Sequence, residues 1–291
     1  MRLYIKSFFF HLTEKLGIGK LSRETSFAKN LAIENYFQQH VLNNPKYSNP
    51  KKLNRFEYNV FSQSGGDGIL EEIFKRIGTT NKFFVEFGVS NGLENMTASL
   101  LMQGWKGCWF EGSTSFFGQI EKSFSLLINE RKLFVKNSFI TAENIQALFK
   151  EKTIPQEFDL LSIDIDGNDY WVWKAITEYK PRVVVIECNP FWGPSISWVM
   201  KYNPTHVWDR TTYYGTSLKA LEILGKEKGY ILVGVSLMGN DAFFVRKDLV
   251  GEKFFAPYTS ENHYESNKVF LFKPYPYKKT VGPFENIKNK Q

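Results

Sequence analysis

The segment FFVEFGVSNG, residues 83–92, decides the fold of this chain. Its first three residues are apolar and typical of a buried strand, and Glu86 follows them. The glycine-rich stretch of residues 88–92 then turns the chain toward a helix. Glycines are needed there because the backbone turns tightly and a ligand approaches where a Cβ would stand. The segment therefore predicts a strand, a ligand-binding loop and a helix.

Outward from this segment, short apolar runs alternate with amphipathic stretches, which predicts an α/β fold with a mostly parallel sheet and helices on both faces. The predicted strands are residues 82–87, 107–111, 132–137, 158–164, 182–188, 230–236 and 242–246. The predicted helices between them include residues 68–77, 95–103, 142–150 and 217–228. The last two of the seven strands are too close for a crossover helix, so they form a terminal antiparallel hairpin. This Rossmann-like arrangement is typical of class I methyltransferases.

The composition fits a globular protein, since 43% of the 291 residues are hydrophobic and 16% are aromatic. We expect a helical lead-in over residues 1–60, a central domain over 61–250 and a basic tail over 251–291. Cys108 and Cys188 lie in predicted strands, which indicates buried, reduced thiols in a cytoplasmic protein.

The two ends of the chain carry most of its basic residues, and the net charge is +7. The N-terminal stretch has no signal-peptide cleavage site. It predicts a basic helix that lies on the inner face of a membrane or packs on its own domain. A nucleic-acid enzyme interleaves basic and aromatic residues along a groove, and this pattern is missing from the sequence, so we expect no nucleic-acid partner.

The loop of residues 86–92 reads E-x-G-x-x-x-G, unlike the G-x-G-x-x-G loops that bind a pyrophosphate. It resembles the first motif of class I S-adenosylmethionine-dependent methyltransferases, with Ser90 where many members carry a further glycine. Their cofactor has a cationic amino-acid end, which suits a nearby carboxylate. The resemblance implies that S-adenosylmethionine is bound by Glu86, Gly88, Ser90 and Gly92.

The next two strand ends extend this predicted cofactor site. Glu111 ends the second strand, where a carboxylate can accept hydrogen bonds from both ribose hydroxyls. A solvated strand end is the plainer alternative for this residue. The third strand ends in Asn137 and Ser138, whose side chains can reach the adenine edge.

The stretch LLSIDIDGNDY, residues 160–170, carries acids directly after an apolar strand. Ligands of open α/β sheets bind at the carboxyl ends of strands. Acids there can hold a divalent cation, remove a proton from a substrate hydroxyl or cap the next helix. We expect Asp164, Glu187 and Asn189, at two neighbouring strand ends, to bind Mg²⁺. Asp166 is a candidate base.

Residues 163–170, IDIDGNDY, resemble the I-D-V-E-G-N-E-Y block of the FkbM family of methyltransferases. Residues 62–68, SQSGGDG, resemble the S-Q-x-G-x-D segment that precedes the cofactor domain in that family. The resemblance covers residues 61–246 and implies O-methylation, commonly of a sugar in a glycan or natural product. The block is also similar, less closely, to magnesium-dependent macrolide-sugar O-methyltransferases, but the spacing after Asp166 departs from theirs.

A long aromatic and polar loop, residues 189–216, follows the fifth predicted strand. Such loops at the catalytic edge commonly form a lid or a substrate wall. Aromatic faces suit stacking on sugar rings, and His206 can accept a proton near neutral pH. The residues that we expect to contact a saccharide acceptor are Trp192, Trp208, Asp209, Arg210 and Tyr213.

Together these patterns favour an O-methyltransferase that acts on a sugar hydroxyl of a glycan, a nucleotide sugar or a lipid-linked saccharide. Asp166 or His206 would be the base. An RNA methyltransferase fits the charge but lacks a recognisable RNA module. The other alternative is a non-catalytic adapter that keeps the fold and binds glycan or membrane through its basic ends.

Overall fold

The computed structural model describes residues 25, 28, 31–268 and 278–288, and the chain forms two units, Met1–Asn49 and Pro50–Gln291. The described part of the first unit includes a π-helical turn, η1 (Gln38–Leu42), and a 3-10 turn, η2 (Pro45–Tyr47). The predicted basic helix at the N-terminus lies outside the described residues. No helix among the described residues is long and apolar enough to cross a membrane.

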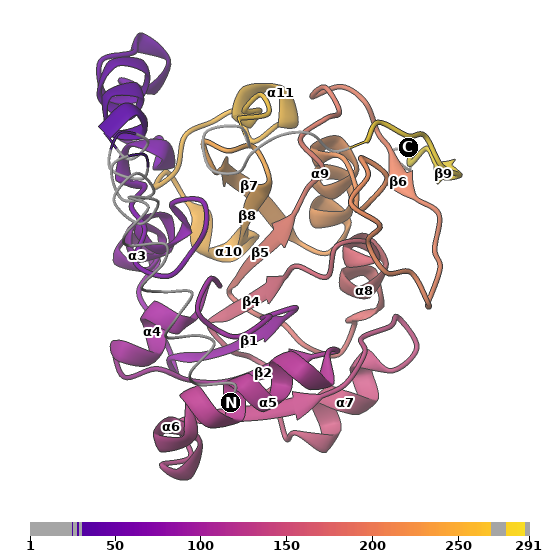
Figure 1. The fold of residues 1–291 in the computed structure, drawn as a ribbon. Helices are drawn as coiled ribbons and strands as arrows, with labels where there is room; N and C mark the ends of the chain where they lie inside the picture. Colours follow the sequence, from indigo (N-terminus) through magenta and orange to yellow (C-terminus); the bar gives the residue numbers. More distant parts are fainter. Residues whose placement is uncertain (1–24, 26–27, 29–30, 269–277, 289–291) are drawn as a thin grey trace, which may run out of the picture. The chain divides into compact units, whose positions relative to one another are not determined.

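The second unit is organised around a seven-stranded sheet (Figure 1). Its strands are β1 (Phe83–Phe87), β2 (Lys106–Glu111), β3 (Leu133–Asn137), β4 (Leu160–Ile163), β5 (Val183–Glu187), β7 (Tyr230–Val235) and β8 (Asp241–Arg246). Their order is β3-β2-β1-β4-β5-β8-β7. Strands β1 to β5 pair in parallel, whereas β8 is antiparallel to both β5 and β7. The predicted sheet and its terminal hairpin are thus confirmed, in the Rossmann-like topology of class I methyltransferases.

Helices cover both faces of this sheet (Figure 1). One face carries α3 (Gly66–Ile77), α4 (Ala98–Met102), α5 (Thr114–Ser123) and α10 (Lys247–Val250). The other carries α7 (Ile145–Glu151), α8 (Asp169–Ala175) and α9 (Leu218–Glu227). Along β1, Val85 and Phe87 pack into the second layer and Phe84 into the first. Because both faces are buried, the strands read as continuous apolar runs rather than alternating ones.

Several shorter elements surround this core. They are η3 (Leu53–Phe56), α6 (Ser125–Asn129), β6 (Val199–Met200), α11 (Ser260–His263) and β9 (Phe284–Glu285). Strands β6 and β9 form a separate two-stranded antiparallel sheet. This small sheet joins the loop after β5 to the C-terminal part of the chain.

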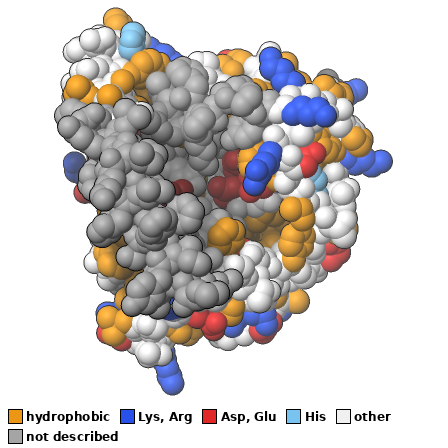
Figure 2. All heavy atoms as spheres, viewed as in Figure 1, with side chains coloured by type: hydrophobic (Ala, Val, Ile, Leu, Met, Phe, Trp, Pro, Cys, Tyr) orange, Lys and Arg blue, Asp and Glu red, His pale blue; other side chains and the backbone are white. Residues whose placement is uncertain are grey.

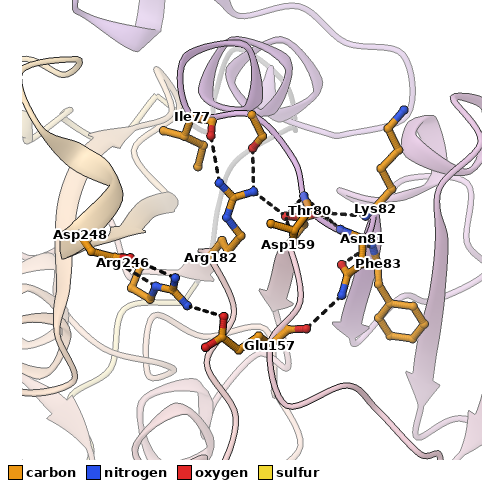
Figure 3. Close-up of polar contacts among 11 residues, drawn as sticks. Ile77, Thr80, Asn81, Lys82, Phe83, Glu157, Asp159, Arg182, Arg246 and Asp248 are labelled. Carbon is orange, nitrogen blue, oxygen red and sulfur yellow. Dashed lines mark hydrogen bonds and ion pairs between the residues drawn. The ribbon is translucent and has the colours of Figure 1, made fainter.

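A buried ion pair fixes the amino ends of β4 and β5 (Figure 3). Arg182 Nη1 lies 2.9 Å from Asp159 Oδ1, and the arginine also donates to the carbonyl oxygens of Ile77 and Gly78 at the end of α3. The Asp159 carboxylate accepts further hydrogen bonds from the backbone N–H groups of residues 80–82. These partners compensate the cost of burying both charges. The opposite ends of the strands are left for the site.

Candidate active site

A cavity of about 440 Å³ opens at the carboxyl ends of β1, β2 and β4. This volume lies within the usual range for small-molecule sites, about 300–1,000 Å³. A second cavity of about 190 Å³ adjoins it at the tips of β4 and β5. The residues that line both cavities are Gly88, Ser90, Asp164, Asp166 and Trp208. In Figure 2, acidic side chains gather in a hollow near the centre of the face shown.

The loop after β1 has the conformation that its glycines predict. Gly88 adopts φ +70°, and a Cβ at this position would collide with the carbonyl oxygen of Asp164. Its N–H donates to the Phe110 carbonyl at 3.1 Å. Ser90 also has a positive φ, +50°. The loop therefore packs directly on the tips of β2 and β4, and only glycine fits at Gly88.

Glu111 lies at the tip of β2 and lines the larger cavity. Its carboxylate accepts hydrogen bonds from the N–H groups of Ser90 at 2.8 Å and Ser113 at 2.7 Å. Burial raises the pKa of Glu111, and the hydrogen bonds from the backbone oppose this rise. A carboxylate has about four acceptor sites, so this one can still accept a hydrogen bond from a ligand hydroxyl beside its backbone partners. The carboxylate is held in position before a ligand arrives.

Two aromatic residues line the same cavity and were not predicted from the sequence. Phe116 on α5 and Phe139 after β3 remain 40% and 46% exposed. Exposed aromatic rings in a concave site suit stacking on a flat ligand ring. Each follows the tip of a strand that carries a predicted site residue, and that position is the signal that could have identified them.

Of the two residues expected to contact adenine, only one lines the cavity. Ser138 lines the cavity. Asn137 does not, because its Nδ2 donates to the Glu111 carbonyl at 2.7 Å and its Oδ1 accepts from Thr114 Oγ1 at 3.1 Å. Asn137 therefore joins the ends of β2 and β3 instead of facing a ligand.

Glu86 and Gly92 also lie away from the larger cavity. Glu86 is only 3% exposed and accepts hydrogen bonds from Met96 N at 2.9 Å, Thr97 Oγ1 at 2.6 Å and Ser162 Oγ at 3.1 Å. Burial raises the pKa of Glu86 to about 7. This carboxylate therefore fixes the segment that leads into α4. A Cβ at Gly92 would lie 2.7 Å from two aromatic rings, so this glycine serves packing.

Three acids meet at the tips of β4 and β5. Carboxylate oxygens of Asp164, Asp166 and Glu187 lie within 4.8 Å of one another. Burial raises the pKa of Asp164 and of Glu187, and repulsion among the acids raises both further. Solvent reaches Asp164 through the cavity, while protein atoms surround it on its other sides. Oxygen ligands in this arrangement suit a divalent cation.

The side chain of Asn189, which we expected to be a metal ligand, is engaged with the backbone of the long loop. Its Nδ2 donates to the carbonyl oxygens of Thr212 and Tyr214 at 3.0 and 2.9 Å. Its Oδ1 accepts from Phe191 N at 3.1 Å. With the side chain engaged in this way and 1% exposed, Asn189 fixes the long loop.

The turn between β4 and α8 positions two of the acids. Asp169 is fully buried and accepts from the N–H groups of Ile165 at 2.8 Å and Gly167 at 2.9 Å. This clamp holds the turn in which Asp166 adopts φ +54°. The third acid of the sequence block is therefore a structural residue, but it holds the turn before α8 and does not cap the helix, because its partners precede the helix.

His206 lies against this turn and lines the larger cavity. A Cβ at Gly167 would come within 3.2 Å of its Nε2, and its ring is hydrogen-bonded to the backbone of Asp166. Burial lowers the pKa of His206. Its buried Nε2 has no hydrogen-bond partner within the described structure. A neutral imidazole with an available nitrogen is suited to accept a proton.

The long loop after β5 forms one wall of the smaller cavity through Trp208 and Tyr214. Their rings meet edge to face with centroids 6.0 Å apart, and Trp208 Nε1 donates to the Thr211 carbonyl. Gln63 and Glu94, which we did not assign from sequence, line the same cavity and are joined by a hydrogen bond of 3.3 Å. The other expected acceptor residues do not line either cavity: Trp192, Asp209, Arg210 and Tyr213.

No protein-family model and no curated protein matches the sequence. Three solved structures illustrate what it is similar to in fold. The pyocyanin biosynthetic protein PhzM has 14% identity and a TM-score of 0.39, over 61% of this chain and 54% of that one. An S-adenosylmethionine-dependent methyltransferase from Clostridium acetobutylicum ATCC 824 has 11% identity and a TM-score of 0.41, over 64% and 92%. An O-methyltransferase from Bacillus cereus in complex with SAH has 17% identity and a TM-score of 0.31, over 42% and 55%. The chain thus spans about half the length of the first and the third.

Proposed function

We propose that this chain is an S-adenosylmethionine-dependent O-methyltransferase of the FkbM type that methylates a sugar hydroxyl. The observation that carries this proposal is the pair of adjoining cavities that share Gly88 and Asp164. Transfer of a small group requires a donor and an acceptor that are held against each other in line. Two cavities that meet at the tips of β1 and β4 meet this requirement.

The larger cavity fits the nucleoside part of the cofactor. Glu111 would bind the two ribose hydroxyls, and Phe116 and Phe139 would stack on the adenine ring. Ser138 would contact the adenine edge. When bound, S-adenosylmethionine supplies an electrophilic methyl group. The protein supplies its orientation and the exclusion of water from it.

The smaller cavity fits an acceptor hydroxyl. A hydroxyl is a poor nucleophile until its proton leaves, so a base must lie within hydrogen-bond reach. The two candidates are His206, which lines the larger cavity, and Asp166, which lines both cavities. The lowered pKa of His206, which keeps its imidazole neutral, favours it, particularly if Asp166 serves a cation.

We further propose that Asp164, Asp166 and Glu187 would hold a magnesium ion. The fit rests on their close carboxylates and on the buried Oε2 of Glu187, for which no hydrogen-bond partner exists among the described residues. A divalent cation would offset the repulsion among the acids and polarise an acceptor hydroxyl. Turnover by an enzyme stripped of metal with a chelator would contradict this assignment.

The charges of the site favour a neutral saccharide over RNA. Of the described residues that line the two cavities, none is lysine or arginine. Proteins that bind nucleic acid neutralise phosphates with these side chains. Trp208 and Tyr214 offer aromatic faces for a sugar ring. Two buried thiols are in keeping with an enzyme that works in the cytoplasm.

Transfer of a radiolabelled methyl group tests the proposal. Purified protein is incubated with methyl-labelled S-adenosylmethionine and with glycan, lipid-linked saccharide or RNA fractions from cells that lack the gene. We expect label in a saccharide fraction, released as an O-methyl sugar after acid hydrolysis. Label in RNA alone would support the rival methyltransferase. Absence of S-adenosylhomocysteine binding by calorimetry would support the adapter.

A further inference from the structure

The walls of the smaller cavity are built from loops. One wall comes from the long loop after β5, through Trp208 and Tyr214. A second wall comes from the turn between β7 and β8, through Met238 and Asn240. Loops of this kind keep a fixed position only when other parts of the chain hold them. In this protein, the described parts of the C-terminal segment, residues 265–268 and 278–285, contact both walls.

The β7–β8 turn is held by the first part of this segment. Lys268 donates from Nζ to the Leu237 carbonyl at 3.2 Å and from its backbone N–H to the Met238 carbonyl at 3.1 Å. The same Nζ lies 3.1 Å from the Glu265 carboxylate, and both residues of this ion pair are buried. A Cβ at Gly239 would lie 2.8 Å from the Glu265 carbonyl oxygen. The turn therefore packs against a buried ion pair.

The long loop is held by the last part of the segment. Strand β9 pairs with β6, and Lys201 N donates to the Pro283 carbonyl at 3.0 Å. Thr212 N donates to the Lys278 carbonyl at 3.1 Å, and Thr212 Oγ1 accepts from Thr280 N at 3.0 Å. In sequence, Lys201 and Thr212 flank the stretch that carries His206 and Trp208. The stretch is thus fixed at its two ends by the C-terminal segment.

At Gly282 the C-terminal segment packs closely against the long loop. Gly282 lies against the ring of Tyr213, with which any Cβ at this position would collide. The Tyr213 hydroxyl donates to the Pro283 carbonyl at 2.7 Å. The neighbouring Val281 is 74% exposed. A larger side chain at Gly282 would therefore disrupt the contact with the long loop, whereas a substitution at Val281 would not.

We propose that residues 265–268 and 278–285 are a positioning element of the acceptor site, which sets the distance between its two walls and thereby the affinity for the acceptor. The role in acceptor affinity rests on the proposed function, whereas the role in fixing the two walls does not. Among the described residues of this segment, none lines the larger cavity. Met238 and Asn240 of the β7–β8 turn line the smaller of the two cavities and not the larger, so Lys268 acts on acceptor binding, whereas the long loop also carries His206 and Trp208 into the larger cavity.

Hydrogen exchange of the full-length protein, followed by mass spectrometry, tests the positioning. We expect Gly282→Val to speed exchange in residues 199–216, and Lys268→Met to speed it in residues 236–241, each on the order of tenfold because local opening becomes easier. The matched control Val281→Ala should leave both regions unchanged. Residues 83–92 should exchange as in the wild type in all three variants. Wild-type exchange rates in residues 199–216 of Gly282→Val and in residues 236–241 of Lys268→Met would overturn the proposal.

A kinetic measurement separates positioning from loss of structure. With a panel of p-nitrophenyl glycosides as acceptors, Lys268→Met should raise the acceptor KM on the order of tenfold, with kcat and the Kd for S-adenosylhomocysteine unchanged within about twofold. Gly282→Val should raise the acceptor KM to a similar extent and also lower kcat, because the stretch that Gly282 helps to fix carries His206. Equal losses of cofactor and acceptor affinity would overturn the proposal. If Gly282→Val does not fold, Lys268→Met carries both measurements. A wild type that is inactive with every acceptor contradicts the proposed function and leaves the exchange result decisive for the positioning.

Discussion

Glu111 is the residue on which recognition of the cofactor ribose is expected to depend. Its carboxylate is held by two backbone N–H groups and faces the cavity in the folded protein. We expect Glu111→Ala to weaken S-adenosylhomocysteine binding by about tenfold to a hundredfold, since hydrogen bonds to a charged group contribute about 1.5–3 kcal/mol. Calorimetry measures this directly. Glu121→Ala, at an exposed position of α5, is the control. Wild-type affinity in a folded Glu111→Ala protein would remove Glu111 from the ribose role.

The choice of base is also decided by single residues. His206→Ala should lower kcat about a hundredfold or more, the usual contribution of general-base catalysis, with cofactor affinity retained. Asp166→Asn should lower kcat as well if Asp166 is the base. If Asp166 instead binds the cation, added magnesium should partly restore its activity. Initial rates over a range of magnesium concentrations distinguish the two roles. Wild-type rates in both variants would exclude both residues as the base.

At the level of residues, the sequence reveals those whose role is set locally. Gly88 and Glu111 could be predicted because a turn and a strand end impose their positions within a few residues. Glu86 was assigned to the cofactor, but its carboxylate is engaged with Thr97 and Ser162, a partnership that forms only when β1 and β4 pair. Phe139 lacked a pattern of its own. Its place in the cavity depends on the shape of the whole sheet.

At the level of elements, apolar runs revealed all seven strands of the main sheet, because both of its faces are buried. Helices α5 and α8 were not predicted. Ser113 is the N-cap of helix α5, and its side chain accepts from Phe116 N. The helix buries only Ile120, so its apolar pattern is weak. The pairing of β6 with β9 joins residues about 85 positions apart, and two-residue strands carry no periodicity.

The loop after β1 and the tip of β4 should behave as one structural unit. Gly88→Ala introduces both a strained positive φ and a collision with the Asp164 carbonyl, so the tip of β4 must move. We expect this variant to lose cofactor binding together with at least 2 kcal/mol of stability, because a left-handed alanine alone costs about 1–2 kcal/mol. Gly104→Ala is the matched control, with φ +80° and no atom within 4 Å of the added Cβ. Equal effects of the two substitutions would show that the contact between loop and strand has no importance.

For the whole molecule, the ion pair of Arg182 with Asp159 joins α3, β4 and β5 at the end of the sheet away from the site (Figure 3). Arg182→Met should cost about 3–5 kcal/mol of unfolding free energy, because it leaves a buried carboxylate without its cationic partner. Arg246→Met, which removes the partly exposed pairs with Glu157 and Asp248, should cost about 1 kcal/mol or less. Urea unfolding compares the two, and calorimetry should find cofactor affinity unchanged in both. Equal stabilities would contradict the structural importance of the buried pair.

The stability of the whole molecule should also depend on pH through His263. This side chain is 4% exposed, and burial, followed by the charge of Lys52, lowers its pKa to about 3, while Glu222 opposes the shift. Below a pH of about 6.5 the unfolded chain binds a proton that the folded protein does not. Stability is therefore present above the unfolded pKa and is lost as the pH falls toward 3, by about 2 kcal/mol between pH 7 and pH 5.

Buried carboxyls such as Asp169, whose pKa is raised to about 6, work in the opposite direction, because they bind protons more readily in the folded state. The measurement must therefore compare wild type with His263→Gln by urea unfolding at both pH values. The carboxyl contributions cancel in that comparison. We expect the variant to lose about 2 kcal/mol less than the wild type when the pH is lowered from 7 to 5. Parallel losses in the two proteins would mean that His263 is protonated in the folded state, at odds with its burial beside Lys52.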